Sequence, residues 1–172
     1  MKTFTILGTG WLGFELAKAF KDDYLMKVSS RNEEKIKIYE EEGFSSYILN
    51  ENNLDFLDEL LNTNYLFVNF PPSKFDDYLG FLEKIYSHKK IKNIEKIIFI
   101  SSTSIYPNIE GFFDEDFKIE DSSSKIVFEA ENLVLNRSDI IFRVSALVGA
   151  NRVSGRRLSN KIVEYPKSVI NF

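Results

Sequence analysis

The stretch that decides the fold is ILGTGWLGFELAKAF, residues 6–20. It sets Gly8, Gly10 and Gly13 at the G-x-G-x-x-G spacing, directly after an apolar run and directly before a helical pattern. In that context the first glycine permits a tight turn, the second lets the backbone approach a pyrophosphate, and the third lets the helix pack closely on a sheet. The N–H groups and the dipole at the start of such a helix attract phosphates. The alternative is a tight strand–helix turn that holds no ligand.

Short apolar runs alternate with helical patterns along the chain. Strands are predicted at Thr3–Leu7, Tyr24–Ser30, Ser45–Leu49, Tyr65–Phe70, Lys96–Ser102, Asp139–Leu147 and, at the end of the sequence, Lys167–Phe172. Helices are predicted at Leu12–Phe20, Asn32–Gly43, Ser73–Lys89 and Ser123–Asn136. Ser73 followed by Asp76 resembles a capping box, which places the start of the third helix at Ser73. The alternation predicts an α/β fold, a doubly wound parallel sheet (Rossmann fold) in a single domain.

Composition limits the classes of function. A chain of 172 residues fits one domain, and its net charge of −4 argues against a basic surface for nucleic acid or an anionic membrane. The absence of cysteine excludes disulfides and thiolate zinc sites, and a single histidine, His88, argues against a histidine metal cluster or a Ser-His-Asp triad. No apolar stretch approaches the roughly 20 residues of a membrane span, and the N-terminus lacks a signal-peptide pattern. We therefore expect a cytoplasmic protein without a nucleic-acid or membrane partner.

The end of the second predicted strand indicates which dinucleotide the glycine motif would hold. An NAD-preferring site carries an acidic residue about 20 residues beyond the glycines, where it binds the ribose 2′-OH. Here the strand ends in Ser29, Ser30 and Arg31, and the first acidic residue is Glu33. Because Arg31 can pair with a 2′-phosphate while the serines donate hydrogen bonds, the sequence favours NADP. If Arg31 is a solvated loop residue instead, NAD remains the alternative.

Several motifs follow the glycine motif in a fixed order along the chain. The fifth predicted strand ends in FISSTSIYPN (residues 99–108), DSSSKIVFEAE follows at residues 121–131, and VNFPPS stands at residues 68–73. Arg143 begins an R-x-x-x-x-x-G continuation of the sixth strand. Together with the glycine motif, this order resembles the extended, or atypical, short-chain dehydrogenase/reductase family in its NAD-dependent epimerase/dehydratase branch. The resemblance covers the whole chain, and it implies a small-molecule substrate such as a nucleotide sugar.

The resemblance also implies a cofactor site and a catalytic site. The implied cofactor-binding residues are Gly8, Thr9, Gly10, Trp11, Leu12, Gly13, Ser30, Arg31, Phe70, Pro71, Ser101 and Lys125. In such enzymes a serine after the fifth strand orients the substrate oxygen, and a tyrosine four residues before a lysine acts as acid or base. Ser102 matches this serine and Lys125 matches this lysine. A serine cluster that only hydrogen-bonds loop backbone is the alternative for Ser102.

The tyrosine of this pattern is missing, because Asp121 stands four residues before Lys125. With an unperturbed pKa of about 3.9, a carboxyl group holds no proton to donate at neutral pH, and a nearby lysine lowers its pKa further. Tyr106, on the active-site loop, is the predicted stand-in. Its usual role in the family is to line the substrate pocket. The pair Tyr86 and Lys90 has the right spacing but ends a helix that runs away from the cofactor.

Two functions therefore stay open. One is an NADP-dependent oxidoreductase or epimerase that acts on a hydroxyl or carbonyl. The other is a non-catalytic dinucleotide-binding module, such as a redox sensor or regulatory partner.

Residues 1–150 are expected to form the NAD(P)-binding domain and residues 151–172 a remnant of the substrate-binding region, since family members continue well past this point. Arg152, Arg156 and Arg157 are candidates for an anionic group of the substrate, with solvent-exposed charge as the alternative. The apolar loop Ile109–Phe117 could line the substrate pocket or simply cover the sheet edge. A pocket open on one side weakens substrate recognition, and a homodimer is the arrangement that we expect to close it.

Overall fold

The computed structural model describes residues 1–149 and 151–153. Its centre is a six-stranded sheet in the order β3-β2-β1-β4-β5-β6, and every pair of neighbouring strands is parallel. The strands are β1 (Thr3–Leu7), β2 (Leu25–Ser30), β3 (Ser45–Ile48), β4 (Tyr65–Val68), β5 (Lys96–Ser102) and β6 (Ile140–Val144). The chain builds outward from β1 in one direction and then returns to build outward from β4 in the other. This doubly wound topology confirms the predicted α/β fold.

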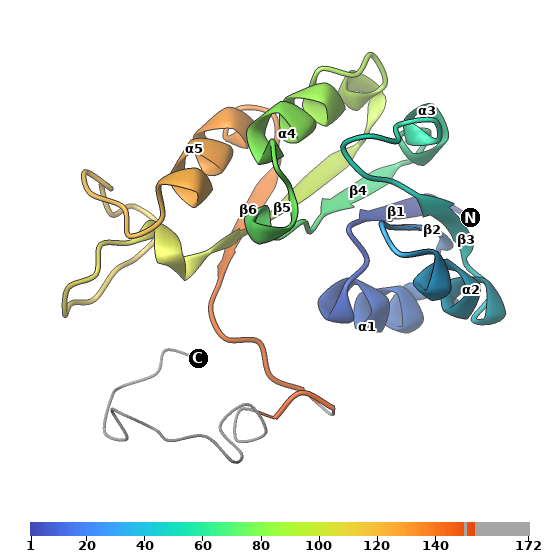
Figure 1. Cartoon of the computed structure of the whole chain (residues 1–172), viewed down its shortest axis with the longest axis horizontal. Coiled ribbons are helices and arrows are strands. Elements are labelled where there is room, and N and C mark those ends of the chain that lie inside the picture. The colour runs from blue at the N-terminus through green and yellow to red at the C-terminus, as the bar shows by residue number, and fades with distance from the viewer. Residues whose placement is uncertain (150, 154–172) are drawn as a thin grey trace.

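Helices cover the sheet on both faces (Figure 1). One face carries α1 (Trp11–Phe20) and α2 (Glu33–Glu41), and the other carries α3 (Leu57–Leu60), α4 (Tyr78–Tyr86) and α5 (Lys125–Val134). Each layer buries its own apolar cluster, because successive strand residues point to opposite faces. Phe4 and Ile6 pack beneath α1 and α2, whereas Leu7 packs beneath α4. None of the helices in the described part of the chain is long and apolar enough to cross a membrane.

The segment after β4 differs from the sequence-based expectation. Pro72–Lys74 form a 3-10 turn, and α4 begins only at Tyr78. The cap is Asp77, whose Oδ1 accepts a hydrogen bond of 2.9 Å from the backbone N–H of Gly80. The predicted helix start at Ser73 is therefore wrong. The turn instead brings Phe75 back onto the core, where its ring stacks on Phe81 with 4.8 Å between centroids. The short helix α3 was not predicted, and the strand predicted at Lys167–Phe172 lies outside the described residues.

The β5–β6 side of the sheet is less covered than the β1–β2 side. Ile141 packs into the cluster beneath α4 and α5, so the alternating neighbours Ile140 and Phe142 face the opposite side. These two side chains are 40% and 50% exposed. On that face the described residues provide no helix over β6, although α1 and α2 cover β1 and β2 fully (Figure 1).

Candidate functional site

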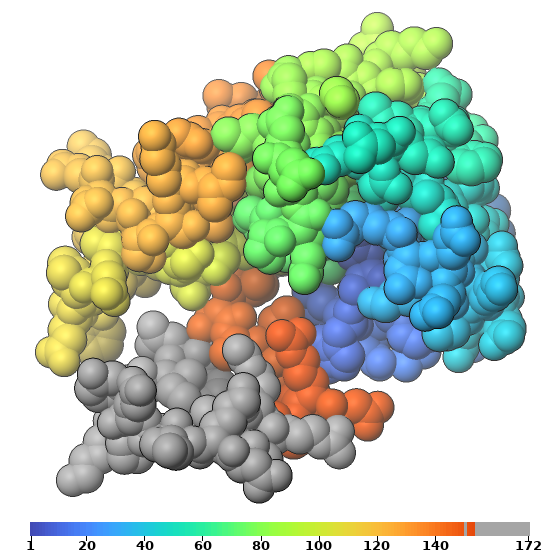
Figure 2. Space-filling view, viewed as in Figure 1, coloured from blue at the N-terminus to red at the C-terminus, as the bar shows by residue number. Residues whose placement is uncertain are grey.

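A cleft of about 940 Å³ opens at the carboxyl end of the sheet, where the strand order reverses between β1 and β4. Its walls come from the loop after β1, the ends of β2 and β5, the turn after β4, the start of α5 and the segment after β6. Figure 2 shows the surface hollowed where α1, the turn after β4 and the segment after β6 meet. Doubly wound sheets bind their ligands at this reversal point.

The three glycines of the loop Gly8–Gly13 (the glycine loop) have different surroundings. Gly8 has a φ of +79°, and a Cβ there would lie 2.6 Å from the carbonyl oxygen of Asn69. At Gly13 a Cβ would lie 2.9 Å from Cγ2 of Ile6, so the glycine lets α1 pack closely on β1. At Gly10 nothing lies within 4 Å of the Cβ position. Gly8 and Gly13 therefore serve the fold, whereas Gly10 leaves open space on the cleft side.

The glycine loop is also held by hydrogen bonds from three neighbouring elements. Gly8 N donates to Ser29 Oγ at 3.1 Å, and Thr9 N donates to the Ser29 carbonyl at 2.8 Å. The Asn69 side-chain amide donates to the Gly8 carbonyl at 3.3 Å, and the Tyr39 hydroxyl donates to the Thr9 carbonyl. The loop is thus fixed by the protein alone. Sequence reasoning missed Tyr39 and Asn69, because no local pattern indicates that α2 and the end of β4 reach this loop.

The start of α1 faces the cleft with its backbone. Gly10 is the N-cap, and within the described part of the chain no side chain hydrogen-bonds to the first turn. The first N–H groups of a helix have no partner within it, so here they are available to a ligand. Gly10, Trp11 and Leu12, which the sequence analysis names as cofactor-binding residues, all line the cleft. The free N–H groups suit an anion at the start of α1, and the open space at Gly10 lets a diphosphate come close to the backbone.

The cleft is positively charged although the whole chain has a net charge of −4. Arg31, Lys35 and Lys74 line it where β2, α2 and the turn after β4 meet, and Arg152 lines it beside Trp11. No aspartate or glutamate of the described chain contributes to its walls. Arg31 donates to the carbonyl of Lys74 and lies over the ring of Phe75. This concentration of one sign of charge favours an anionic ligand.

Four further predicted cofactor residues, Ser30, Phe70, Pro71 and Ser101, also line the cleft, whereas Gly13 and Lys125 do not. Ser30 is buried, and its Oγ accepts a hydrogen bond of 3.1 Å from the backbone N–H of the α2 cap. Phe70 is buried and Pro71 follows it, so both shape the wall after β4. The hydroxyl of Ser101 is turned into the protein, where it donates to Glu131 Oε2 at 2.7 Å. Ser101 therefore helps to fix the end of β5.

The three predicted catalytic residues are not gathered around one point. Ser102 lines the cleft, with its Oγ accepting a hydrogen bond of 3.2 Å from Ser104 N. Lys125 begins α5 with an 86% exposed side chain, and its Nζ lies 3.6 Å from Glu129 Oε1. Its neighbours in sequence line the cleft, but Lys125 itself does not. Asp121 precedes α5, so it does not share a helix face with Lys125 in the way that a tyrosine at this spacing would.

The hydroxyl of Tyr106 is engaged away from the cleft. It accepts a hydrogen bond of 3.0 Å from Nη1 of Arg143 and donates one of 2.9 Å to the carbonyl of Asp114. The ring stacks on Phe113 with 5.2 Å between centroids. Tyr106 is not among the described residues that line the cleft. In this arrangement it anchors the apolar loop 109–117 to the sheet.

A buried ion pair connects β5, α5 and β6 behind the cleft. Glu131 is 5% exposed and accepts hydrogen bonds from Nε and Nη2 of Arg143 at 3.0 Å and 2.6 Å. The hydrogen bonds that the Arg143 guanidinium donates to this carboxylate are the main cause that raises its pKa above the ordinary value. Sequence reasoning missed Glu131. The available signal was its position on the apolar face of α5, beside Ala130 and Val134.

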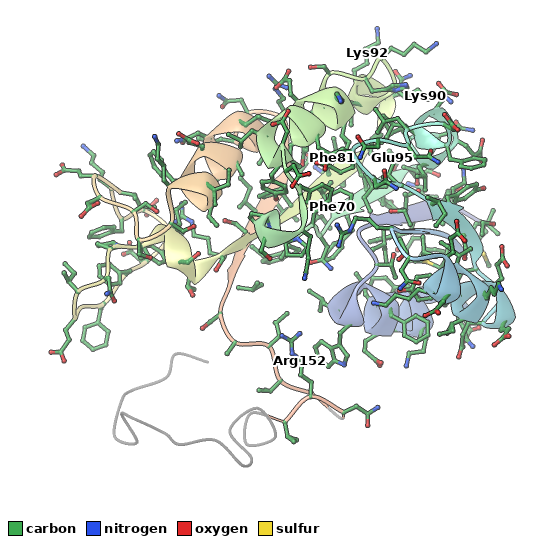
Figure 3. The ribbon with its side chains drawn as sticks, in the orientation of Figure 1. Phe70, Phe81, Lys90, Lys92, Glu95 and Arg152 are labelled. Atoms are coloured by element: carbon green, nitrogen blue, oxygen red, sulfur yellow. The ribbon has the colours of Figure 1, made fainter. Side chains whose placement is uncertain are left out.

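Tyr86 and Lys90, which have the spacing of the catalytic tyrosine and lysine, lie away from the cleft, as expected. Tyr86 is buried and shares a hydrogen bond of 3.0 Å with Ser138, and burial raises its pKa to about 12. Lys90 pairs with Asp58, and Figure 3 places it at the far end of α4.

Comparisons with known proteins extend this picture. No protein-family model matches the chain. Among curated proteins it is similar to Protein YeeZ of Escherichia coli (strain K12), with 27% identity over 94% of this chain and 64% of YeeZ. The chain thus spans less than two thirds of the length of that relative.

Two solved structures share the architecture. A functionally unknown conserved protein from Silicibacter pomeroyi has a TM-score of 0.71 and 18% identity, over 95% of this chain and 59% of its own. The UDP-glucuronic acid 4-epimerase from Bacillus cereus, in complex with NAD, has a TM-score of 0.59 and 19% identity, over 82% of this chain and 55% of its own. At these identities the likeness shows the fold, which agrees with the doubly wound sheet described above.

Proposed function

We propose that the chain binds a nicotinamide dinucleotide across the carboxyl end of the sheet, with the diphosphate on the glycine loop. The observation that carries this proposal is the contrast among the glycines. Gly10 alone of the three has open space at its Cβ position, and it stands at the uncapped start of α1 in a cationic cleft. A turn that served only the fold would not need this position kept open. The complex of the Bacillus cereus epimerase with NAD supports the same class of ligand.

We favour NADP over NAD on the grounds of charge. Arg31, Lys35 and Lys74 converge where the ribose of the adenosine lies in a doubly wound site. Among the residues that the structure describes, no acidic side chain lines the cleft there to accept a hydrogen bond from the ribose 2′-OH. Three cations on one side of the site suit a 2′-phosphate, which brings about two further negative charges. Arg31 is the central member, because its guanidinium already lies over Phe75 and bridges to the backbone of Lys74.

For the chemistry, the resemblance to the epimerase/dehydratase branch supports hydride transfer to or from a hydroxyl or carbonyl, on a substrate such as a nucleotide sugar. For Ser102 we propose that it holds the substrate oxygen, which its position in the cleft wall at the end of β5 supports. Lys125 would hold the nicotinamide ribose from the first turn of α5, after its flexible side chain leaves Glu129. Both roles are proposals for these residues.

A non-catalytic dinucleotide-binding module is the second candidate, and a specific observation favours it. The position four residues before Lys125 is Asp121, which lies outside α5, and the hydroxyl of Tyr106 is committed to Arg143 and Asp114. Tyr78 does line the cleft, but its hydroxyl donates to the carbonyl of Phe70 at 3.1 Å. Within the described residues, neither Tyr78 nor Tyr106 therefore offers an uncommitted phenolic proton beside Ser102. The two candidates share the binding site and differ only in turnover.

The binding proposal is tested by calorimetric titration of NADP⁺ and NAD⁺ into the wild type and into Gly10→Ala. We expect the wild type to bind NADP⁺ more tightly. A methyl group at Gly10 meets no protein atom, so we expect Gly10→Ala to fold normally and to lose at least about tenfold in affinity because it occupies the diphosphate position. Absence of heat with both dinucleotides in the wild type would overturn the proposal.

Turnover is tested separately, by an anaerobic hydride-transfer screen of NADPH with candidate carbonyls and nucleotide sugars. Oxidation of NADPH that falls in Ser102→Ala and Lys125→Ala supports the enzyme. Tight cofactor binding without any oxidation supports the non-catalytic module.

A further inference from the structure

The segment that follows β6 returns to the start of α1 and is fitted against Trp11. Gly149 and Arg152 pair through two backbone hydrogen bonds, Gly149 N to Arg152 O at 3.1 Å and Arg152 N to Gly149 O at 2.9 Å. A Cβ at Gly149 would lie 2.6 Å from Cη2 of Trp11, so only glycine permits this close approach. Residues from opposite ends of the described chain therefore meet at the mouth of the cleft.

This arrangement fixes where the guanidinium of Arg152 lies. The guanidinium carbon is 5.3 Å from the centre of the Trp11 ring, and Arg152 lines the cleft. Figure 3 shows Arg152 on the segment beyond β6, close to α1 and on the opposite side of the view from Lys90 and Lys92. Stacking on the indole restricts the side chain and holds the charge beside the first turn of α1.

The charge of Arg152 has no counterpart among the described residues, since it forms no ion pair with any of them. The start of a helix carries a partial positive charge, so a cation beside it is unfavourable unless an anion lies between them. An anion at the mouth of α1 would satisfy both the first-turn N–H groups and the guanidinium. Arginine is suited to this because its planar donors match two phosphate oxygens at once.

We infer that Arg152 is a binding residue for the diphosphate, which it contacts from the segment after β6, beside Trp11. This inference rests on the proposed function and adds a second anchor to it. The diphosphate is held between α1 and the segment after β6, whereas Arg31 and its neighbours hold the 2′-phosphate. Arg152 and the group around Arg31 thus bind different phosphates of the same ligand, and each can be substituted without the other.

The test uses two ligands that separate these phosphates. ADP-ribose contains the diphosphate but no 2′-phosphate, and adenosine 2′-monophosphate contains the 2′-phosphate but no diphosphate. In calorimetric titrations we expect Arg152→Gln to weaken ADP-ribose by about tenfold, the loss of one hydrogen-bonded charge, and to change the binding of adenosine 2′-monophosphate by less than about twofold. Arg152→Lys keeps the charge without the planar donors, so we expect an intermediate affinity for ADP-ribose.

Arg137→Gln is the matched control, because Arg137 pairs with Glu83 away from the cleft and its loss leaves both affinities unchanged. Equal affinity of the wild type and Arg152→Gln for ADP-ribose would overturn the inference, as would an equal loss for both ligands. If the wild type binds neither ADP-ribose nor NADP⁺, the proposed function fails as well. If the wild type binds and only the effect of Arg152 is absent, the proposed function stands without this anchor.

Discussion

At the β1–β2 end of the cleft, hydrogen bonds from Ser29, Tyr39 and Asn69 hold the glycine loop from three elements. At the β5–β6 end, Ser102 lines the cleft while Lys125 extends toward solvent, and the hydroxyl of Tyr106 is hydrogen-bonded to Arg143 and Asp114. The first end is prepared for a ligand by the fold itself. The second end would have to move side chains to assemble a reacting group. The proposed binding and the proposed chemistry therefore depend on different parts of this molecule and can be tested separately.

The largest expected effect comes from breaking the ion pair behind the β5–β6 end. Glu131→Ala removes the carboxylate that pairs with Arg143 and accepts from Ser101, so it should lower the free energy of unfolding by about 3 kcal/mol. Urea denaturation measures this change. Glu129→Ala removes an exposed partner on the same helix, and we expect less than about 0.5 kcal/mol for it. Equal losses in the two variants would contradict a structural role for the buried pair.

The β1–β2 end is tested by adding a methyl group at Gly8. Gly8→Ala combines a left-handed backbone with a collision against Asn69 and Phe70, and we expect a loss of about 2–3 kcal/mol in unfolding free energy. Gly43 is the matched control, because its φ is +88° and nothing lies within 4 Å of its Cβ position. Gly43→Ala should show only the backbone strain, about 1 kcal/mol. Thermal and urea unfolding of both variants isolate the collision.

Selectivity for the dinucleotide gives a smaller effect. Arg31→Ala should weaken NADPH by about tenfold and NADH by less than about twofold, because only NADPH carries the 2′-phosphate. Competitive titration against ADP-ribose measures both affinities. A wild type that binds the two cofactors equally would refute the preference for NADP. An equal loss for both in Arg31→Ala would assign Arg31 to the wall of the cleft and not to the phosphate.

The smallest expected effect is a pH-dependent change in stability at Asp139, which links the start of β6 to the start of β5. The Lys96 ammonium, and then the backbone N–H of Ile97, hold the pKa of Asp139 below its ordinary value. A lowered folded-state pKa contributes stability that is fully present above the unfolded value, about 3.9, and is lost as the pH falls through the folded value. Asp139→Asn should therefore cost less than about 1 kcal/mol at pH 7 and nothing near pH 2. Unfolding free energies measured across this range check the sign.

Local sequence patterns were enough to predict most of the fold. The β-rich apolar runs marked all six strands, and Gly8 and Gly13 stand where their backbone geometry requires glycine. The start of α4 was missed because Ser73 and Asp77 both offer a capping side chain, and only the return of Phe75 to the core decides between them. Such a choice depends on packing between distant segments, which periodicity does not describe.

For the site, backbone positions were predictable and side-chain directions were not. The sequence placed Ser102 and Lys125 at the correct strand and helix ends. It could not indicate that Lys125 turns to Glu129, or that Arg143 takes the hydroxyl of Tyr106, because these partners are chosen by the arrangement of three elements. The buried Glu131 belongs to the same class of feature.

The fit of residues 149 and 152 against Trp11 has a practical consequence. Trp11 is the single tryptophan of the 172-residue chain, and it lies at the mouth of the cleft. Intrinsic emission excited at the indole band therefore originates entirely from that location. An anion that draws the guanidinium away from the ring alters the electrostatic environment of the fluorophore, so the unlabelled molecule provides its own optical signal of occupancy.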